Sequence, residues 1–405
     1  MMGKQKKHQH QPRRQRSYDD DPLPSSAFDA PSLIASSIEQ AQSDEEEALD
    51  ELLDLSKDAG DYNLRHTLYQ RSVQSPKGDI SYLQKFFLTY VGGRIPLHLY
   101  EDFCGTALIC AEWVRGDARR TALGIDLDEE TLIWGLQHNI GKLGIDAHSR
   151  SRLLCGDVLH PLSKARVIKF EESKVPCTWS SAVDCQVTSS HEDLNQEEST
   201  TGKSSKTVGQ TCSCSEKESE VRSPNNDVVA ESVWPGADVV CALNYSCCCL
   251  HKRSDLVAYF KRVLKLISTE GGIFVLDIYG GTSSECAMKL RRRYEEFMYI
   301  WEQEDFDVVT RTTRISLHFQ LNKSHRMLRH AFTYRWRLWT LPEVRDCLEE
   351  AGFSFVHIWI REMSEAKDGD EVEATSSVKF EEVGSFLQQH SWNAYVVAVK
   401  CRTSE

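Results

Sequence analysis

The fold of this chain is decided by residues Leu97–Ile109, which read LHLYEDFCGTALI. An apolar, strand-like run reaches Glu101 and is followed by a Phe-Cys-Gly-Thr turn and a helix-compatible stretch. A strand that ends in a turn of small residues and opens a helix leaves free backbone N–H groups beside a bound ligand. The dinucleotide pattern G-x-G-x-x-G is absent, and Glu101 and Asp102 would repel a diphosphate. The stretch therefore predicts a ligand site at a strand–helix turn that does not hold a pyrophosphate.

Composition and charge argue against several classes of protein. The 405 residues carry a formal net charge of −13, which argues against a general nucleic-acid-binding surface. No apolar run approaches the roughly 20 residues that span a bilayer, and the basic N-terminus lacks the apolar region of a secretory signal. We therefore expect the 14 cysteines as reduced thiols in the cytoplasm, with the nucleus as an alternative. Cysteine pairs with zinc-site spacing are absent, so we expect no metal.

Two segments differ in amino-acid composition from the rest of the chain. Residues 1–60 are polar and contain a dense acidic block, which favours a disordered, charged N-terminal tail. Residues 171–231 are rich in Ser, Thr, Glu and Asp, and a loop of this length inside a compact domain is normally disordered or regulatory. We expect one domain over residues 61–400 that a disordered acidic insertion interrupts at 171–231. The tail and the insertion are also candidate sites for protein partners.

Apolar runs and amphipathic segments alternate through most of this domain. Two helices are expected between residues 61 and 90, ahead of the first strand. Ala237–Leu243 and Ile273–Ile278 are continuous apolar runs of the kind found in buried parallel strands. Such alternation indicates a doubly wound α/β sheet. The other predicted elements are strands at Thr121–Ile125 and Arg152–Cys155 and helices at Ala107–Val114, Asp128–Asn139 and Asp255–Ile267.

The pattern changes near residue 283. Ser283–Phe297 is predicted as a helix, whereas Arg314–Gln320 and Phe332–Trp339 alternate as antiparallel strands do. We therefore expect a β-rich insert at residues 299–339 that caps the ligand site. A helix from Leu341 and two closing strands, Phe353–Ile360 and Trp392–Val399, complete the domain.

The order of the polar strand ends resembles that of the class I S-adenosylmethionine (AdoMet) dependent methyltransferases. The first motif of that family is acidic–x–Gly–x–Gly–x–Gly, and residues 101–107 read Glu-Asp-Phe-Cys-Gly-Thr-Ala, so that only Gly105 remains of the three glycines. Asp126 lies about twenty residues beyond Gly105, where the family has an acid that binds the ribose hydroxyls. LYQRSVQSP, WEQEDFD and AFTYRWRLWTLPE further resemble a poorly characterised subgroup with plant and bacterial members. The resemblance implies a Rossmann-like, seven-stranded sheet with the antiparallel insert over the acceptor site.

The resemblance also implies AdoMet as the cofactor. Leu127 would pack against the adenine ring, and Asp157 would accept from the adenine amino group. Asn244 lies in the loop after the fourth strand, which faces the methyl group in this family. The implied cofactor-binding residues are Glu101, Phe103, Cys104, Gly105, Thr106, Asp126, Leu127, Asp157 and Asn244.

Candidate residues for the methyl acceptor come from three segments. The segment before the first strand would form a lid, as in small-molecule members, although a polar helix face with a core tyrosine explains it equally well. The loops after the fourth and fifth strands and the β insert would supply the others, but aromatic side chains in strands are more often core. The candidates are Tyr69, Gln74, Tyr245, Tyr279, Trp336 and Arg337, with Tyr299, Trp301 and Trp339 as further aromatic residues of the insert. No catalytic residue is assigned, because transfer from a sulfonium requires mainly alignment of the acceptor and exclusion of water.

The sequence thus predicts an AdoMet-dependent methyltransferase (EC 2.1.1.-) that acts by direct in-line displacement on an unidentified acceptor, expected to be a small molecule. Two alternatives stay open. A nucleic-acid (RNA) methyltransferase is suggested by residues 102–105, but the loop Asn244-Tyr245-Ser246 lacks the prolines that hold a flipped base in many such enzymes. The other alternative is a protein that binds the cofactor without catalysis and acts through protein partners.

Overall fold

The computed structural model describes residues 59–160, 162–169, 234–362 and 379–402. Residues 1–58 of the predicted charged tail (1–60) lie outside the described ranges. The whole predicted insertion, residues 171–231, also lies outside them. The first described helix, α2, spans Ala59–Val73 and so begins two positions before the expected domain boundary at residue 61. Within the described ranges, no helix has the length and apolar character needed to cross a membrane.

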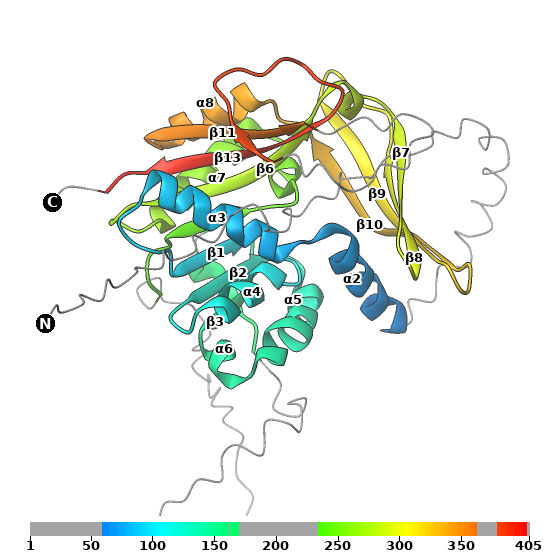
Figure 1. The fold of residues 1–405 in the computed structure, drawn as a ribbon, viewed down its shortest axis with the longest axis horizontal. Coiled ribbons are helices and arrows are strands. Elements are labelled where there is room, and N and C mark those ends of the chain that lie inside the picture. The colour runs from blue at the N-terminus through cyan, green and yellow to red at the C-terminus, as the bar shows by residue number, and fades with distance from the viewer. Residues whose placement is uncertain (1–58, 161, 170–233, 363–378, 403–405) are drawn as a thin grey trace, which may run out of the picture.

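A large, mostly parallel sheet forms the centre of the molecule (Figure 1). Its strands are β1 His98–Asp102, β2 Thr121–Asp126, β3 Ser151–Cys155, β4 Arg166–Val167, β5 Val239–Ala242, β6 Gly272–Gly280, β11 Phe355–Glu362, β12 Glu381–Glu382 and β13 Trp392–Lys400. They lie in the order β12-β11-β13-β6-β5-β1-β2-β3-β4. Five neighbouring strands, β3, β2, β1, β5 and β6, are parallel to one another. Strand β13 lies between β6 and β11 and runs antiparallel to both. This arrangement confirms the predicted Rossmann-like, doubly wound sheet.

The strand count differs from the expected seven. Nine described strands form this sheet, and the two additional ones, β4 and β12, are each two residues long. Each lies at one edge, where it pairs antiparallel with β3 or with β11. Such short edge strands cover backbone groups that would otherwise stay unpaired.

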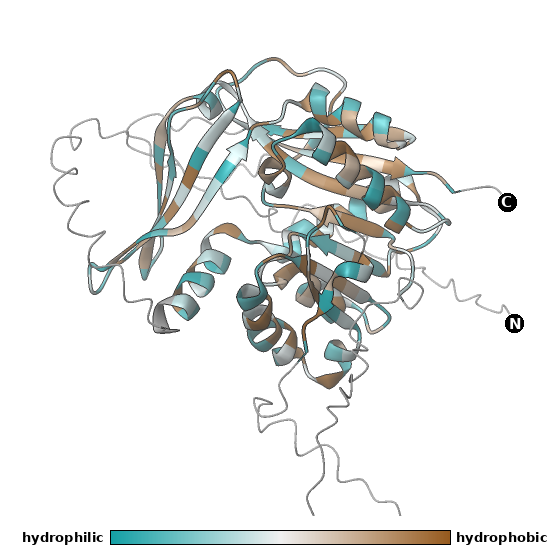
Figure 2. Cartoon of the chain, turned by 180° about the vertical axis from the view of Figure 1, so that it is seen from behind, coloured by the Kyte–Doolittle hydropathy of each residue, from teal (hydrophilic) through white to brown (hydrophobic). Residues whose placement is uncertain are grey.

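Helices bury the central strands on both faces. In β5, Val239 and Cys241 belong to one apolar cluster, whereas Val240 and Ala242 belong to the other. This explains why the fourth and fifth strands read as continuous apolar runs, a concentration of apolar residues that Figure 2 shows along the central strands. The helices are α3 Pro76–Tyr90, α4 Leu108–Gly116, α5 Glu129–Gly135 with a π-helical continuation at Leu136–Ile140, α6 Ile145–Ser149, α7 Arg253–Leu266 and α8 Leu341–Ala351.

The topology creates a switch point between β1 and β5. These two strands are neighbours in the sheet, but the chain leads from β1 toward β2 and β3 on one side and from β5 toward β6 on the other. Ligands bind to such sheets outside the carboxyl ends of the strands at the switch point. The turns after β1, β2 and β5 all lie at this end of the sheet.

Four antiparallel strands form a second sheet beside the first (Figure 1). They are β7 Met288–Arg293, β8 Phe297–Gln303, β9 Thr312–Leu321 and β10 Met327–Arg337, in the order β10-β9-β8-β7. The helix predicted over Ser283–Phe297 is wrong, because a short 3₁₀ turn at Thr282–Glu285 is followed by β7. Leu, Lys and Arg favour a helix locally, but the backbone of β7 pairs with β8 along its whole length and overrides that preference. The antiparallel region therefore begins before residue 299.

Helix α2 connects the second sheet to the turn after β1. On one side, the ring of Tyr69 lies 4.8 Å from the ring of Phe332 on β10. On the other side, Gln70 Nε2 donates a hydrogen bond of 2.8 Å to Thr106 Oγ1. The two helices predicted before the first strand are thus present as α2 and α3, and α2 covers the carboxyl end of the central sheet.

Candidate active site

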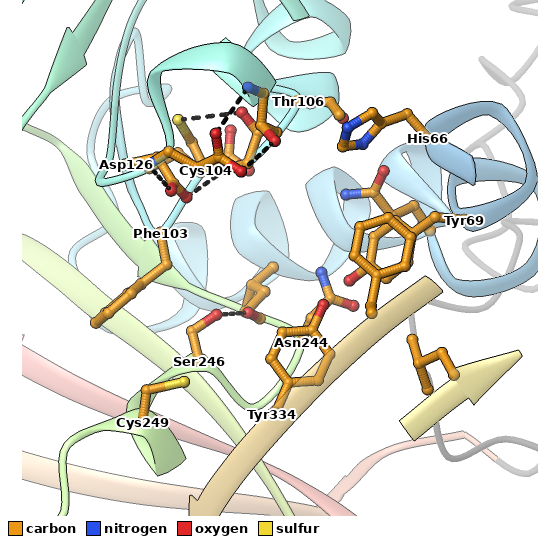
Figure 3. Close-up of a pocket in the computed structure, with 18 of the residues that line it drawn as sticks. His66, Tyr69, Phe103, Cys104, Thr106, Asp126, Asn244, Ser246, Cys249 and Tyr334 are labelled. Carbon is orange, nitrogen blue, oxygen red and sulfur yellow. Dashed lines mark hydrogen bonds between the residues drawn. The ribbon is translucent and has the colours of Figure 1, made fainter. Parts of the chain in front are cut away.

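A cavity of about 300 Å³ lies between the carboxyl ends of the central strands, helix α2 and the second sheet (Figure 3). Cavities of this order are typical of small-molecule sites. Its lining residues are His66, Tyr69, Gln74, Glu101, Phe103, Cys104, Gly105, Thr106, Asp126, Asp128, Thr131, Leu243, Asn244, Ser246, Cys249, Trp301, Leu317, Phe332, Tyr334 and Trp336.

Three alternate residues of the turn after β1 have left-handed backbone conformations. The φ angle is 56° at Phe103, 50° at Gly105 and 53° at Ala107. These are the three glycine positions of the methyltransferase motif, and glycine adopts this region without the strain that a Cβ introduces. The chain therefore adopts a turn that favours glycine at three positions, and two of these positions carry side chains that disfavour it. Strained residues of this kind persist only where the surroundings hold them, and they cluster at ligand sites.

Neighbouring side chains hold this turn in place. Asp126, at the end of β2, accepts a hydrogen bond of 2.8 Å from the Gly105 N–H through Oδ2. Asn139 Nδ2 donates to the Thr106 carbonyl at 2.7 Å, and Gly135 lies so close to that carbonyl that a Cβ would collide with it. Strand β2 and the helical segment after it thus fix the conformation that the local sequence disfavours.

Acidic groups line the same side of the cavity. Glu101 is only 4% exposed, and burial raises the pKa of its carboxyl to about 8, although the Cys110 N–H donates to Oε2 at 3.0 Å. Burial also raises the pKa of Asp126, against the lowering effect of the N–H donors of Asp128 and Gly105. Glu101 is therefore mostly protonated at neutral pH until a cation approaches and stabilises its ionised form.

The turn after β5 is a second left-handed turn at the cavity. Asn244 and Tyr245 both have φ of 60°. Their N–H groups donate to the two carboxyl oxygens of Asp277 at 3.0 Å and 2.8 Å. Asp277 lies in β6 and is 6% exposed. Burial raises the pKa of its carboxyl to about 8. Asp277 thus holds the turn from behind and leaves the Asn244 side chain in the cavity lining.

Helix α2 contributes a buried, neutral histidine. His66 is 2% exposed and packs edge-on against Tyr62 and Phe332 and beside Trp134. Burial, with a smaller contribution from the nearby Arg65 guanidinium, lowers the pKa of His66 to about 4. The imidazole is therefore neutral at physiological pH and offers one nitrogen as a hydrogen-bond acceptor.

Aromatic rings form the wall opposite the acidic groups. Tyr69 comes from α2, Trp301 from β8, and Phe332, Tyr334 and Trp336 from β10. Trp336 stacks on Tyr334 with 5.3 Å between ring centroids and lies 5.6 Å from Trp301. In Figure 3, Tyr69 and Tyr334 lie across the cavity from Thr106, in the turn after β1, and from Asp126, at the end of β2.

Three atoms of the lining that can accept a hydrogen bond have no hydrogen-bond partner among the described residues. They are His66 Nε2, Gln74 Oε1 and Asn244 Oδ1, and all three are buried. A buried polar group without a partner costs about 1–3 kcal/mol. Because all three belong to residues that line one cavity, they favour a ligand with hydrogen-bond donors.

The structure places most of the predicted cofactor-binding residues together. Glu101, the turn residues 103–106, Asp126 and Asn244 all line the cavity. Leu127 and Asp157 do not line it, although they follow β2 and β3 at the same end of the sheet. Leu127 is 69% exposed, and Asp157 accepts a hydrogen bond of 2.8 Å from the Leu159 N–H.

The predicted acceptor-binding residues are divided between the cavity and the core. Tyr69, Gln74 and Trp336 line the cavity, as does Trp301. Three others are engaged elsewhere. The Tyr245 hydroxyl donates to Asn393 Oδ1, the Tyr279 hydroxyl donates to Gln303 Oε1, and Arg337 pairs with Glu343 while stacking on Trp339. Tyr245 is buried and is not part of the cavity lining. Tyr299 and Trp339 are buried and do not line the cavity.

Several lining residues were not singled out from the sequence. His66 lies three positions before Tyr69 on one helix, and Tyr334 lies two positions before Trp336 on one strand, so helical and strand periodicity would have placed each on the face of its predicted neighbour. Asp128, Leu243 and Ser246 lie within two positions of a predicted site residue in the chain. The remaining residues reach the cavity only through tertiary packing, which the sequence does not signal. The lining residues outside the predicted set are His66, Asp128, Thr131, Leu243, Ser246, Cys249, Leu317, Phe332 and Tyr334. The described residues contain no group of three or more His, Cys, Asp or Glu side chains arranged to hold a metal ion.

Comparisons with known proteins find similarity at the level of structure. The sequence matches no model of a protein family and none of the curated proteins. An AdoMet-dependent methyltransferase from Clostridium acetobutylicum is similar with a TM-score of 0.46 and 14% identity, over 83% of this chain and 98% of that protein. An amino pentose methyltransferase from Micromonospora echinaspora has a TM-score of 0.45 and 11% identity, over 83% and 96%. A sugar N-methyltransferase from a Streptoalloteichus species has a TM-score of 0.44 and 11% identity, over 83% and 92%. These similar structures are AdoMet-dependent methyltransferases, the class of enzyme that the sequence resembles.

Proposed function

We propose that this protein is an AdoMet-dependent methyltransferase with a small-molecule acceptor, and that the cavity holds the donor and the acceptor side by side. One observation carries the proposal. Three carboxyl groups and the left-handed turn around Gly105 meet at the carboxyl ends of β1 and β2, beside the topological switch point. An open α/β sheet binds its ligands there, and the acids suit a ligand that carries positive charge and hydroxyl groups rather than a diphosphate.

The residues present fit AdoMet. Glu101, Asp126 and Asp128 provide carboxyl groups for its positive charges and its ribose hydroxyls. Leu127 leaves a large apolar side chain in solvent next to this wall, and Asp157 follows the neighbouring strand. We assign these two residues to the adenine ring and its amino group.

When bound, AdoMet supplies a methyl group on a positively charged sulfur. The protein contributes binding, orientation and exclusion of water. The carboxyl groups line one side of the cavity, the aromatic rings line the other, and α2 contributes His66 and Tyr69 to the lining. In-line displacement requires little else, because alignment of the reacting atoms supplies much of the rate.

The test is calorimetric titration of the full chain with AdoMet and with its demethylated product, S-adenosylhomocysteine. We expect binding of both ligands, and at least about tenfold weaker binding by the Asp126→Asn variant, because one carboxylate oxygen and a charge are lost. Asp146→Asn is the matched control, since Asp146 lies on α6 with a side chain 75% exposed and does not line the cavity. A folded wild-type protein that binds neither ligand would overturn the proposal.

A further inference from the structure

The cavity lining is asymmetric in charge. It contains the carboxyl groups of Glu101, Asp126 and Asp128, and no lysine or arginine is found among the described residues that line it. Arg65 stacks over the ring of Phe332, but it is not part of the lining. An acceptor with a carboxylate or a phosphate would therefore meet no positive side chain and would be repelled by the acidic wall.

The unpartnered atoms specify the hydrogen-bonding character of the acceptor. Gln74 Oε1 and Asn244 Oδ1 are carbonyl oxygens, and the neutral His66 imidazole offers Nε2 as an acceptor when Nδ1 carries the proton. None of them belongs to the acidic turn that the proposed donor would occupy. Gln74 follows α2 and Asn244 follows β5, so the two carbonyl groups reach the cavity from different elements. A ligand group with several N–H or O–H hydrogens can donate to these acceptors.

The aromatic wall adds a preference for positive charge. Tyr69, Phe332, Tyr334 and Trp336 present rings to the cavity from α2 and β10. A cation over the face of such rings gains about 0.5–2 kcal/mol, whereas a neutral hydroxyl does not make this interaction. A protonated amine is thus the one common acceptor group that suits the charge, the unpartnered oxygens and the rings together.

We propose that the methyl acceptor is an aliphatic primary or secondary amine whose nitrogen is bound between Gln74, Asn244 and the aromatic wall. This inference rests on the proposed methyltransferase function and adds the chemical class of the acceptor. Transfer would replace one N–H hydrogen with a methyl group, form a C–N bond as the C–S bond breaks, and release one proton per methyl group. The amine must give up a proton before its lone pair can react, and loss of hydration in a buried site favours the neutral form.

The test measures binding and not turnover. Saturation-transfer NMR is recorded for cyclohexylamine, cyclohexanol and cyclohexanecarboxylate at millimolar concentration, with the full chain saturated with S-adenosylhomocysteine. We expect a signal for the amine, a weaker signal for the alcohol and none for the carboxylate. An alcohol or carboxylate signal equal to that of the amine would overturn the inference, and so would the absence of an amine signal.

Two substitutions at one position sharpen the test. Gln74→Leu removes an acceptor and should weaken amine binding about tenfold, whereas Gln74→Glu replaces the carbonyl with a carboxylate and should preserve or strengthen it. Gln388→Leu is the matched control, because Gln388 is an exposed residue of the loop between β12 and β13 and is not part of the lining. Equal amine binding by the two Gln74 variants would contradict the assignment. Binding of S-adenosylhomocysteine is measured separately, so its loss reports failure of the proposed function and its retention without amine binding reports failure of this inference alone.

Discussion

Two left-handed turns border the cavity, and both are held by a carboxyl group from the next strand of the sheet. In the turn after β1, Asp126 accepts from the Gly105 N–H, and in the turn after β5, Asp277 accepts from Asn244 and Tyr245. The difference lies in where each carboxyl group faces. Asp126 lines the cavity, whereas Asp277 is buried behind its turn and does not. One acid can therefore contact a ligand as well as hold the backbone, and the other acts only on the backbone.

The largest effect is expected from removing the buried acid. Asp277→Ala leaves two buried N–H groups without an acceptor and should lower the free energy of unfolding by about 3 kcal/mol, measured by urea titration. It should also weaken binding of S-adenosylhomocysteine, because the turn that carries Asn244 loses its support.

The matched control for this variant is Asp238→Ala. Asp238 also accepts from two backbone N–H groups, those of Leu97 and His98, and in addition it pairs with Arg94. It directly precedes β5, at the amino ends of β1 and β5, away from the cavity. The Asp238→Ala variant should be destabilised at least as much as Asp277→Ala, and the affinity of its folded form for the ligand should be unchanged. A ligand affinity that falls equally in both variants would show that the loss comes from general destabilisation.

Substitution of Asp126, the acid that lines the cavity, should reduce ligand affinity more than it reduces stability. Asp126→Asn keeps one acceptor for the turn and should cost about 1 kcal/mol of stability or less, while ligand affinity falls at least about tenfold. Calorimetry and urea titration of the same preparation measure both quantities. If the Asp126→Asn variant loses stability but binds the ligand normally, Asp126 has only a structural role, as Asp277 does.

Ligand affinity should also depend on pH through Glu101. Burial raises the pKa of Glu101 to about 8 in the free protein, so the carboxyl is mostly neutral at pH 6 and 7. A cation binds the ionised form better, and AdoMet affinity should therefore rise by up to about tenfold per pH unit toward pH 8 and level off above it.

Comparison of wild type with Glu101→Gln isolates this effect. The ligand has its own titrating groups, but they contribute equally in both proteins and cancel in the ratio of dissociation constants. The ratio should grow from pH 6 to pH 8, as measured by calorimetry. A ratio that is independent of pH would show that no ligand cation approaches Glu101.

The smallest effect is expected from relief of backbone strain. Ala107 has φ of 53° and is completely buried, and glycine is favoured at such an angle. Ala107→Gly should change the free energy of unfolding by less than about 1 kcal/mol in either direction, because the relief of strain is offset by the loss of a buried methyl group. Ligand affinity should stay at the wild-type value. A loss of affinity would mean that rigidity of the turn, and not only its conformation, is required.

Local patterns predicted the central sheet well. The apolar runs that became β5 and β6 are long enough and uniform enough to indicate strands covered on both faces, and the alternation of strand and helix indicates the doubly wound order. Strand β7 was missed because its residues Met288–Arg293 have ordinary helix propensity, and only pairing with β8 makes them a strand. Arg337 and Tyr279 illustrate the same limit at the site, since sequence position alone does not reveal that Glu343 and Gln303 occupy their polar groups.

The sequence by itself determined the fold class and the acidic strand ends, because these follow from hydrophobic periodicity and from residues next to one another in the chain. It also showed that Gly105 is the only one of the three motif glycines present in the turn after β1. Only the tertiary structure decided that Phe103 and Ala107 still adopt the glycine conformation there, because Asp126, Asn139 and Gly135 hold the turn from outside it. Tertiary packing likewise decided which aromatic residues face the cavity and which polar atoms were left without partners, since both depend on contacts between elements far apart in the chain.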